Sequence, residues 1–392
     1  MAVRAAESVL VNFVNWEQVG HAVEAVHCCL GYHRADPSRR IGIVLNANTA
    51  TDIAHWCPFI DEVYTVDVTS NPGPAALAHI PRDWDWVVDD GRNWSSHREA
   101  YPELTRYYDY ARDHFRTTAG HVAHDLFQIG KDHSEPATGA PSYRTGNRLS
   151  LELPAAARSW AESVLPGTGG APTIAVLPAG SDLRWRYPST DSWRLILKSL
   201  QTRFPSARFC FVGKLAADER TSTAFSRREF DALAAVVTEA VSAVDRPLAE
   251  QLAAIERCDL LLSPHSGYSF AGLAVGTPWL VLSGNKWYEH YFNPGVPFYS
   301  VLPDLARYPC YVWLGNEPDP VDDDGPRSPS MCAERIRADL PELLDAAGRL
   351  IEGTWDFPAA MADHFARLSR ISGGRTDVVF TFDDLHTAYL PH

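Results

Sequence analysis

Residues 258–270 read CDLLLSPHSGYSF, and the rest of the sequence is organised around this stretch. It begins as an apolar run of strand length, breaks at a polar turn, and continues into the small-residue run 271–276. Thr277 and Pro278 end that run, and a second apolar strand pattern, 279–282, follows. The order of strand, polar turn, short helix and strand predicts one βαβ unit. Because open α/β sheets bind ligands at the carboxyl ends of their strands, the turn is a candidate binding site.

The turn also has chemistry suited to an anion. Ser266, Gly267 and Ser269 would open the helix, where backbone N–H groups and hydroxyls bind phosphate oxygens with help from the helix dipole. An ordinary capped helix is the alternative interpretation, since Ser266 is a good N-cap residue. The local sequence leaves both interpretations open.

Composition limits the class of protein. The chain has 392 residues, which is too many for one hydrophobic core and predicts two or three domains. Its 45% hydrophobic and 21% charged residues are typical of a globular protein, and the net charge of −14 disfavours a nucleic-acid or anionic-membrane surface. The seven cysteines include no C-x-x-C pair, no stretch is long and apolar enough to span a membrane, and no signal-type segment begins the chain. We therefore expect a soluble, cytoplasmic protein with reduced thiols.

Two series of alternating strand and helix patterns run along the chain. The first begins with the strand pattern 8–14 and the second with 173–177, and a stretch rich in Pro and Gly separates them. Alternation of this kind predicts parallel, doubly wound sheets. We expect an α/β protein with two Rossmann-like domains that face a cleft. The expected boundaries are 1–135 for the first domain, 136–172 for the linker, 173–352 for the second domain and 353–392 for a helical tail that returns to the first domain.

Four segments, in fixed order along the chain, carry a family resemblance. The first combines GHAVEAV at 20–26 with CPFIDEV at 57–63, and the second is WDWVVD at 84–89. The third lies within 177–193 as LPAG, then RWRYP, then SW at 192–193, and the fourth is the opening stretch continued to Gly284. Together they resemble the bacterial heptosyltransferase-type enzymes, which have the GT-B fold of two Rossmann-like domains. The resemblance implies an acceptor-side first domain and a second domain that binds a nucleotide sugar.

The sequence departs from the family pattern at three positions. The Asp that follows the first-loop Gly, the usual catalytic base of the family, is His21 here. In the fourth motif the family's Asp is His265 and its His is Phe270. These changes indicate a divergent branch rather than a lipopolysaccharide heptosyltransferase. An Ala-, Arg- and Asp-rich composition is similar to that of enzymes of antibiotic and other natural-product biosynthesis.

The resemblance implies an inverting, metal-independent glycosyltransferase. It would move a sugar from a nucleotide-diphosphate sugar, GDP- or ADP-linked, to a small-molecule acceptor in secondary metabolism, with no further cofactor and no metal. The alternatives are a nucleotide-sugar epimerase or hydrolase on the same fold and a non-catalytic sugar-nucleotide-binding protein. The missing family Asp favours the last of these.

The same resemblance places the candidate site residues. His21 or Glu17 would take the proton of an alcohol acceptor, with Asp89 in reserve, whereas a thiol acceptor would need no strong base. Arg184 or Arg186 matches the family's phosphate-binding Lys, depending on where one gap falls. The remaining candidates are Lys214, His265, Ser266, Gly267, Tyr268 and Ser269 for the diphosphate; Glu219, Asn285 and Lys286 for the nucleoside or sugar; and Asn15, Trp16 and Asn93 for the acceptor.

Overall fold

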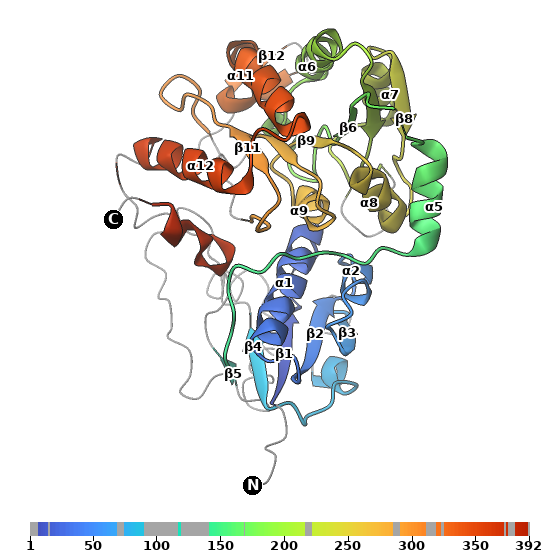
Figure 1. The fold of residues 1–392 in the computed structure, drawn as a ribbon, viewed down its shortest axis with the longest axis vertical. Helices are drawn as coiled ribbons and strands as arrows, with labels where there is room; N and C mark the ends of the chain where they lie inside the picture. The colour runs from blue at the N-terminus through green and yellow to red at the C-terminus, as the bar shows by residue number, and fades with distance from the viewer. Residues whose placement is uncertain are drawn as a thin grey trace. The chain divides into compact units, whose positions relative to one another are not determined.

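Two compact units make up the chain in the computed structural model. Unit 1 comprises Met1–Glu152 with Phe380–Leu385, and unit 2 comprises Leu153–Val379 with His386–His392. Each unit is built on one parallel sheet with helices packed against it (Figure 1). The structure describes residues 7–14, 16–68, 74–89, 117–118, 141–167, 169–215, 222–284, 291–310, 319–322, 325–371, 374 and 381–390.

The sheet of unit 1 has the strand order β3-β2-β1-β4-β5, and every pair is parallel. All six residues of β1 are buried, because a central parallel strand is covered on both faces. Helix α1 packs on β1 and β2, while Trp84 and Leu77 belong to a second apolar cluster with strand residues such as Leu10. The elements are β1 (Ser8–Phe13), α1 (Val19–Ala35), β2 (Arg40–Asn46), α2 (Asp52–His55), β3 (Glu62–Val66), η1 (Pro74–Leu77), β4 (Trp86–Asp89) and β5 (Thr117–Thr118).

A segment near the carboxyl terminus completes the core of unit 1. Thr381 and Phe382 are fully buried there, and Asp383 has a left-handed backbone with φ of 61°. The Asp383 carboxylate accepts hydrogen bonds from the Tyr143 hydroxyl and, at 3.2 Å, from the Gly146 N–H. This strained backbone is rare for a residue other than Gly, so the surrounding contacts must hold it in place.

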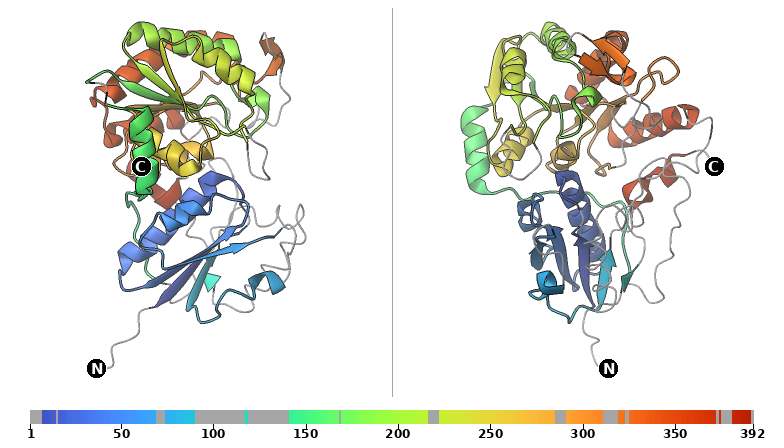
Figure 2. Two further views of the ribbon diagram at one scale, coloured as in Figure 1. Left: turned by 90° about the vertical axis from the view of Figure 1, so that its right-hand side faces the viewer. Right: turned by 180° about the vertical axis from the view of Figure 1, so that it is seen from behind.

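The sheet of unit 2 has the order β11-β10-β9-β6-β7-β8, again all parallel. Helices lie on both faces of it (Figure 2). Helices α6, α7 and α11 share one core with Leu260 and Leu262 of β9, whereas Gly272 of α9 packs on Leu261, which points to the opposite face. The strands are β6 (Thr173–Val176), β7 (Arg208–Phe211), β8 (Glu239–Ser242), β9 (Leu260–Pro264), β10 (Trp279–Leu282) and β11 (Phe298–Val301).

The helices of unit 2 alternate with these strands, and one hairpin is added. Helix α5 packs on α8, and the two strands of the hairpin, β12 and β13, are antiparallel. The elements are α5 (Ala155–Val164), η2 (Arg184–Arg186), α6 (Thr190–Arg203), α7 (Arg227–Ala234), α8 (Leu248–Glu256), α9 (Gly267–Ala274), β12 (Asp319–Asp322), β13 (Gly325–Arg327), η3 (Pro329–Met331), α11 (Ala333–Ile351), α12 (Phe357–Ile371) and, shared between the two units, η5 (Phe382–Ala388).

The strand orders confirm the predicted fold class of two doubly wound parallel sheets. In unit 1 the chain reverses its direction across the sheet between β1 and β4, and in unit 2 between β6 and β9. Ligands of doubly wound sheets bind at the carboxyl ends of the two strands that flank such a switch point. The loops after β1, β4, β6 and β9 are therefore where a site is expected. The domain boundaries drawn from composition stay a prediction about which parts fold independently.

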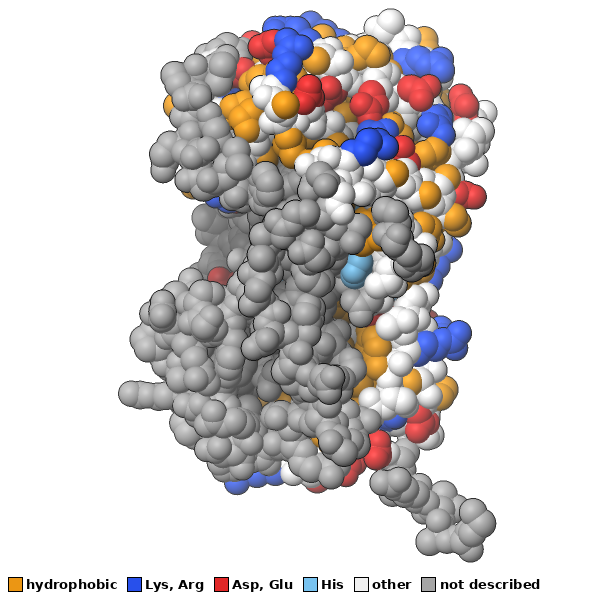
Figure 3. All heavy atoms as spheres, turned by 90° about the vertical axis from the view of Figure 1, so that its left-hand side faces the viewer, with side chains coloured by type: hydrophobic (Ala, Val, Ile, Leu, Met, Phe, Trp, Pro, Cys, Tyr) orange, Lys and Arg blue, Asp and Glu red, His pale blue; other side chains and the backbone are white. Residues whose placement is uncertain are grey.

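Charges of both signs are mixed on the described surface. Lys and Arg side chains lie among Asp and Glu side chains on the face drawn in Figure 3. Within the described residues, no helix has the length and apolar character needed to cross a membrane.

Two helix glycines predict opposite responses to the same substitution. Replacing Gly by Ala inside a helix normally stabilises it by about 0.5–1 kcal/mol. A Cβ at Gly31 of α1 would lie 2.1 Å from the Tyr143 ring, and such overpacking costs about 1–3 kcal/mol, so Gly31→Ala should destabilise the protein. A Cβ at Gly348 of α11 would meet its nearest atom, on Arg203, at 3.7 Å, so Gly348→Ala should stabilise. Chemical denaturation of both variants measures the difference, and equal stabilisation by the two would contradict this packing.

A buried histidine predicts how stability changes with pH. His364 of α12 lies among the rings of Phe292, Phe298 and Phe365, and burial lowers its pKa from 6.5 to about 3. Between pH 6.5 and about pH 3, His364 is protonated in the unfolded chain but neutral in the folded protein. The contribution of His364 to stability is therefore complete above pH 6.5 and falls as the pH drops, by up to about 1.4 kcal/mol per pH unit.

The variant His364→Phe should flatten this loss of stability. Melting temperatures of the wild type and the variant, measured from about pH 8 to pH 5, report the difference. His55→Phe changes an exposed histidine and is the control, which should follow the wild type. Parallel curves for the wild type and His364→Phe would show that another group causes the acid sensitivity.

Candidate functional site

The two loops at the switch point of unit 2 touch each other. The loop after β6 contains Gly180 and Tyr187, and the turn after β9 contains Ser266, the N-cap residue of α9. The Ser266 hydroxyl accepts a hydrogen bond from the Tyr268 N–H at 3.3 Å, as predicted for a capped helix. A Cβ on Gly180 would lie 3.0 Å from both the Ser266 Oγ and the Tyr187 hydroxyl, so the absence of a side chain at Gly180 lets the two loops approach this closely without displacing either hydroxyl.

The first turn of α9 is held by Gln251 of α8. The Gln251 Oε1 accepts from the Tyr268 hydroxyl at 2.9 Å and from the Gly213 N–H at 2.9 Å, and its Nε2 donates to the Arg246 carbonyl at 2.7 Å. Gly213 follows β7 with φ of 142°, a conformation that favours glycine. One amide side chain therefore joins the ends of β7 and the start of α9. Its only sequence signal is a lone amide inside the otherwise apolar and acidic run LAEQLAAIE.

Two other residues predicted to bind the diphosphate anchor α9 to the sheet. Ser269 is fully buried, and its hydroxyl is 2.7 Å from that of Ser263, which also accepts from the Trp279 indole at 2.8 Å. His265 is buried, and its ring packs in a T-shaped arrangement with the Phe270 ring, at a centroid distance of 5.5 Å. Their side chains thus fix the helix start, which offers an anion the positive end of the helix dipole.

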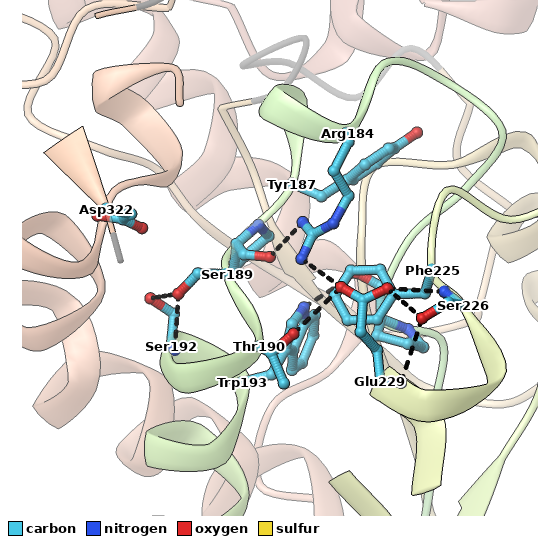
Figure 4. A network of polar contacts seen from close by, with 12 residues as sticks. Arg184, Tyr187, Ser189, Thr190, Ser192, Trp193, Phe225, Ser226, Glu229 and Asp322 are labelled. Atoms are coloured by element: carbon cyan, nitrogen blue, oxygen red, sulfur yellow. Dashed lines mark hydrogen bonds and ion pairs between the residues drawn. The ribbon is translucent and has the colours of Figure 1, made fainter. Parts of the chain in front are cut away.

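Arg184 is held by three groups of unit 2 (Figure 4). Its guanidinium donates to the Pro188 carbonyl at 3.0 Å and to Glu229 at 2.9 Å, and it lies 4.1 Å from the centroid of the Phe225 ring. Burial acts to raise the pKa of Glu229, but hydrogen bonds from Ser226 and the Arg184 charge outweigh it and lower that pKa. The carboxylate of Glu229 is therefore ionised and compensates the Arg184 charge.

Arg186 and Lys214 are placed differently. Arg186 donates to Asp182 at 2.6 Å, and among the described residues its buried Nε has no hydrogen-bond partner. An unmet buried donor costs about 1–3 kcal/mol, which a ligand could recover. Lys214 directly follows Gly213 after β7 and is half-buried.

A buried arginine fixes the backbone of this loop. Arg327 of β13 is 1% exposed and donates to the carbonyls of Arg184, at 3.2 Å, and Tyr187. Its Nε lies 3.1 Å from the carboxylate of Asp322, which also accepts from the Ala333 N–H at the start of α11. The hairpin β12–β13 therefore sets the conformation in which η2 presents its arginines.

The first turns of α1, which follow the loop after β1, place a carboxylate beside His21. The Nδ1 of His21 lies 2.8 Å from Oε2 of Glu24, whose side chain is fully buried, while the His21 side chain is 22% exposed. Trp16 stacks on the His21 ring with a centroid distance of 4.2 Å and an angle of 28°. Glu17 is exposed. Glu24 was not predicted as a site residue, although a spacing of three residues on one helix was the signal for it.

Several predicted site residues lie outside the described residues. For Asp89 only the backbone is described, as the last residue of β4, which pairs with Asn12 of β1. Within the described residues, no group of three or more His, Cys, Asp or Glu side chains is placed to hold a metal ion. The candidates outside the described residues are Asn15, Asn93, Glu219, Asn285 and Lys286.

Solved structures share this fold, although no protein-family model and no curated protein matches the sequence. A glycosyl transferase of family 9 from Veillonella parvula is similar with a TM-score of 0.58 and 15% identity, covering 88% of this chain and 98% of that one. The E. coli ADP-heptose LPS heptosyltransferase II has a TM-score of 0.52 and 11% identity, with 87% and 99% covered. The E. coli heptosyltransferase WaaC, solved with ADP, has a TM-score of 0.52 and 13% identity, with 87% and 99% covered.

These similarities confirm the resemblance at the level of the fold. They extend over nearly the whole of each compared chain, so both parallel sheets are matched rather than one alone. The protein has the GT-B fold of these glycosyltransferases.

The contacts of the two arginines predict that they differ in their effect on stability. Arg184→Met removes a hydrogen bond, an ion pair and a ring contact at once, and should cost about 1–2 kcal/mol. Arg186→Met removes a partly exposed ion pair and a looser ring contact, with Trp185 at 4.9 Å. It also removes the buried Nε donor that has no partner among the described residues, so it should cost less than about 1 kcal/mol. Denaturation curves of the two variants give both values, and a larger loss for Arg186→Met would reverse the assigned roles.

Proposed function

We propose that the protein is an inverting glycosyltransferase that uses a nucleotide-diphosphate sugar. The observation that carries this proposal is the contact between Gly180 and Ser266, which brings the two loops at the switch point of unit 2 together at the start of α9. A helix start at that position suits a diphosphate. The proposal also draws on the fold shared with the family 9 transferase and the two heptosyltransferases.

In this proposal Arg184 and Arg186 have separate roles. Each arginine is paired with a carboxylate, Arg184 with Glu229 and Arg186 with Asp182. Arg184 also binds the Pro188 carbonyl and the Phe225 ring, and so holds the loop in shape. Arg186 binds the diphosphate, because its buried Nε has no partner among the described residues and its loop lies beside the Ser266 cap. The α9 dipole adds to this positive charge and stabilises the leaving nucleoside diphosphate as its bond to the sugar breaks.

Unit 1 supplies the base in the same reaction. An inverting transfer joins the acceptor to the anomeric carbon on the face opposite the leaving diphosphate, and the acceptor proton must be removed. His21 holds the family's base position and lies against a carboxylate, whereas Glu17 is exposed. His21 is therefore the proposed base, with Trp16 stacked on its ring.

The nucleobase of the donor, the acceptor, the lack of a metal requirement and the cellular location are also proposals. The donor carries ADP or GDP, for which the ADP bound to the E. coli WaaC structure is the nearest support. The acceptor is a small molecule of secondary metabolism, the reaction needs no metal, and the protein works in the cytoplasm. The family resemblance of the four sequence segments supports a reaction without metal, and the composition of the chain supports the secondary-metabolic acceptor and the cytoplasmic location.

Nucleotide binding tests the assignment to unit 2. Thermal-shift measurements with ADP, GDP and UDP should show a rise in melting temperature for ADP or GDP, because a ligand of the folded state stabilises it. Arg186→Met should lose most of that rise. Arg194→Met removes the same charge from the half-exposed surface of α6 and should keep it. No rise with any of the three nucleotides would contradict the donor site.

Turnover separates the candidate activities. Release of nucleoside diphosphate that requires an added acceptor supports the transferase. Conversion or hydrolysis of the donor alone favours the epimerase or hydrolase, and binding without any conversion favours a sugar-nucleotide-binding protein.

A further inference from the structure

We propose that Glu24 and His21 act as one base that deprotonates a hydroxyl acceptor, so that the acceptor of this site is an alcohol and not a thiol. Glu24 is the positioning residue and His21 the catalytic residue. The inference rests on the proposed transferase function for its substrate class, but the pairing of the two side chains can be tested without it.

The geometry of the pair comes from the start of α1. The helix begins at Val19, so His21 and Glu24 are three residues apart on one face of its first turns. The Glu24 Oε2 lies 2.8 Å from Nδ1 of His21, which is hydrogen-bond distance. Trp16 covers one face of the imidazole and restricts its rotation. Two neighbours thus fix the ring, one through a ring nitrogen and one through its face.

The carboxylate decides which nitrogen of the ring carries the proton. We take Glu24 as ionised; an ionised carboxylate only accepts hydrogen bonds, so Nδ1 of a neutral His21 then carries the hydrogen that the two side chains share. The lone pair that takes up a proton is then on Nε2. A carboxylate partner also stabilises the imidazolium that forms when His21 takes up a proton. A buried carboxylate has the same effect on the catalytic histidine of Ser-His-Asp acyl-transfer enzymes.

The burial of Glu24 indicates that the pair has a function. Its side chain is fully buried, and an ionised carboxylate without a partner in such a place is strongly unfavourable. The second nearby histidine on α1, His27, is also fully buried, and burial lowers its pKa to about 4, so His27 is neutral at pH 7 and brings no positive charge. Of these two rings, His21 is the partly exposed one, and the carboxylate is directed to it.

In the proposed transfer, His21 is the protein group that takes up the acceptor proton and later releases it. The acceptor O–H gives its proton to Nε2 while its oxygen forms the bond to the anomeric carbon. The bond from that carbon to the diphosphate breaks, and the diphosphate leaves with the electron pair. The Nδ1 hydrogen stays on His21, shared with Glu24, and the imidazolium later gives the Nε2 proton to water.

The substrate class follows from the need for such a base. A thiol is partly ionised near neutral pH and attacks as the thiolate, so a general base adds little for it. An alcohol is not ionised there and depends on proton removal in the transition state, which contributes about 10²–10⁴ in rate. A buried carboxylate that holds a histidine in one tautomer therefore points to a hydroxyl acceptor.

The tautomer of His21 is the direct test. Long-range ¹H–¹⁵N spectra of protein with labelled histidine, taken where the ring is neutral, should show the His21 hydrogen on Nδ1. The variant His21→Gln assigns the signal. Glu24→Leu should move the hydrogen to Nε2, and Glu24→Gln, which keeps the side-chain shape if the leucine variant fails to fold, should reduce the Nδ1 form. Glu17→Leu changes the exposed carboxylate of the same loop and should leave the tautomer unchanged. A hydrogen on Nε2 in the wild type overturns the pairing.

Phenol and thiophenol, which differ in one atom, test the substrate class with ADP-glucose as donor. ADP release with phenol should fall about 10²–10⁴-fold in His21→Gln and about 10–100-fold in Glu24→Leu, with kcat reduced and KM little changed. Transfer to thiophenol that is faster than transfer to phenol, and unaffected by His21→Gln, overturns the hydroxyl class. No release of nucleoside diphosphate from either ADP-glucose or GDP-glucose by a wild-type protein with the expected tautomer contradicts the transferase function and leaves the pairing intact.

Discussion

The close contact between the loop after β6 and the N-cap of α9 is the constraint on which the candidate site of unit 2 depends. It exists because β6 and β9 are neighbours in a parallel sheet although they are far apart in the sequence, so that their following loops leave the same edge. Gly180 permits the approach, Gln251 holds the far side of the helix start, and Arg327 fixes the backbone that carries the arginines. Each of these residues acts on the position of α9 or η2, and none of them needs to touch a ligand.

The sequence was sufficient for the fold wherever strands are buried on both faces. Runs such as 260–262 and 279–282 are continuously apolar because parallel strands of this kind have no polar face, and the structure has strands in both places. Strand β8, with the sequence EAVS, lies at the edge of the sheet and is largely exposed, so it lacks that signal and was not predicted. The hairpin β12–β13, with DPVD and GPR, was missed because such residues are typical of loops.

The site was predicted less completely, since its key contacts join residues of different elements. The N-cap at Ser266 is a local pattern and could be found. The choice between Arg184 and Arg186 depends on Glu229, which is 45 residues away from Arg184 and on another helix. Glu24 was missed because its pairing with His21 depends on where the helix begins, and the observed helix begins at Val19 and so includes both residues.

The carboxyl-terminal segment of unit 1 has a consequence for the order of folding during synthesis. Asp383 binds Tyr143 across a separation of 240 residues, and the whole of unit 2 up to Val379 lies between them in the sequence. A ribosome therefore releases all the residues of the unit 2 sheet before it releases the segment that completes unit 1. Unit 2 can form its native core first, while the core of unit 1 still lacks Phe382. Contacts so distant in sequence also form slowly, so the incomplete unit 1 is the stage most exposed to aggregation and to chaperones.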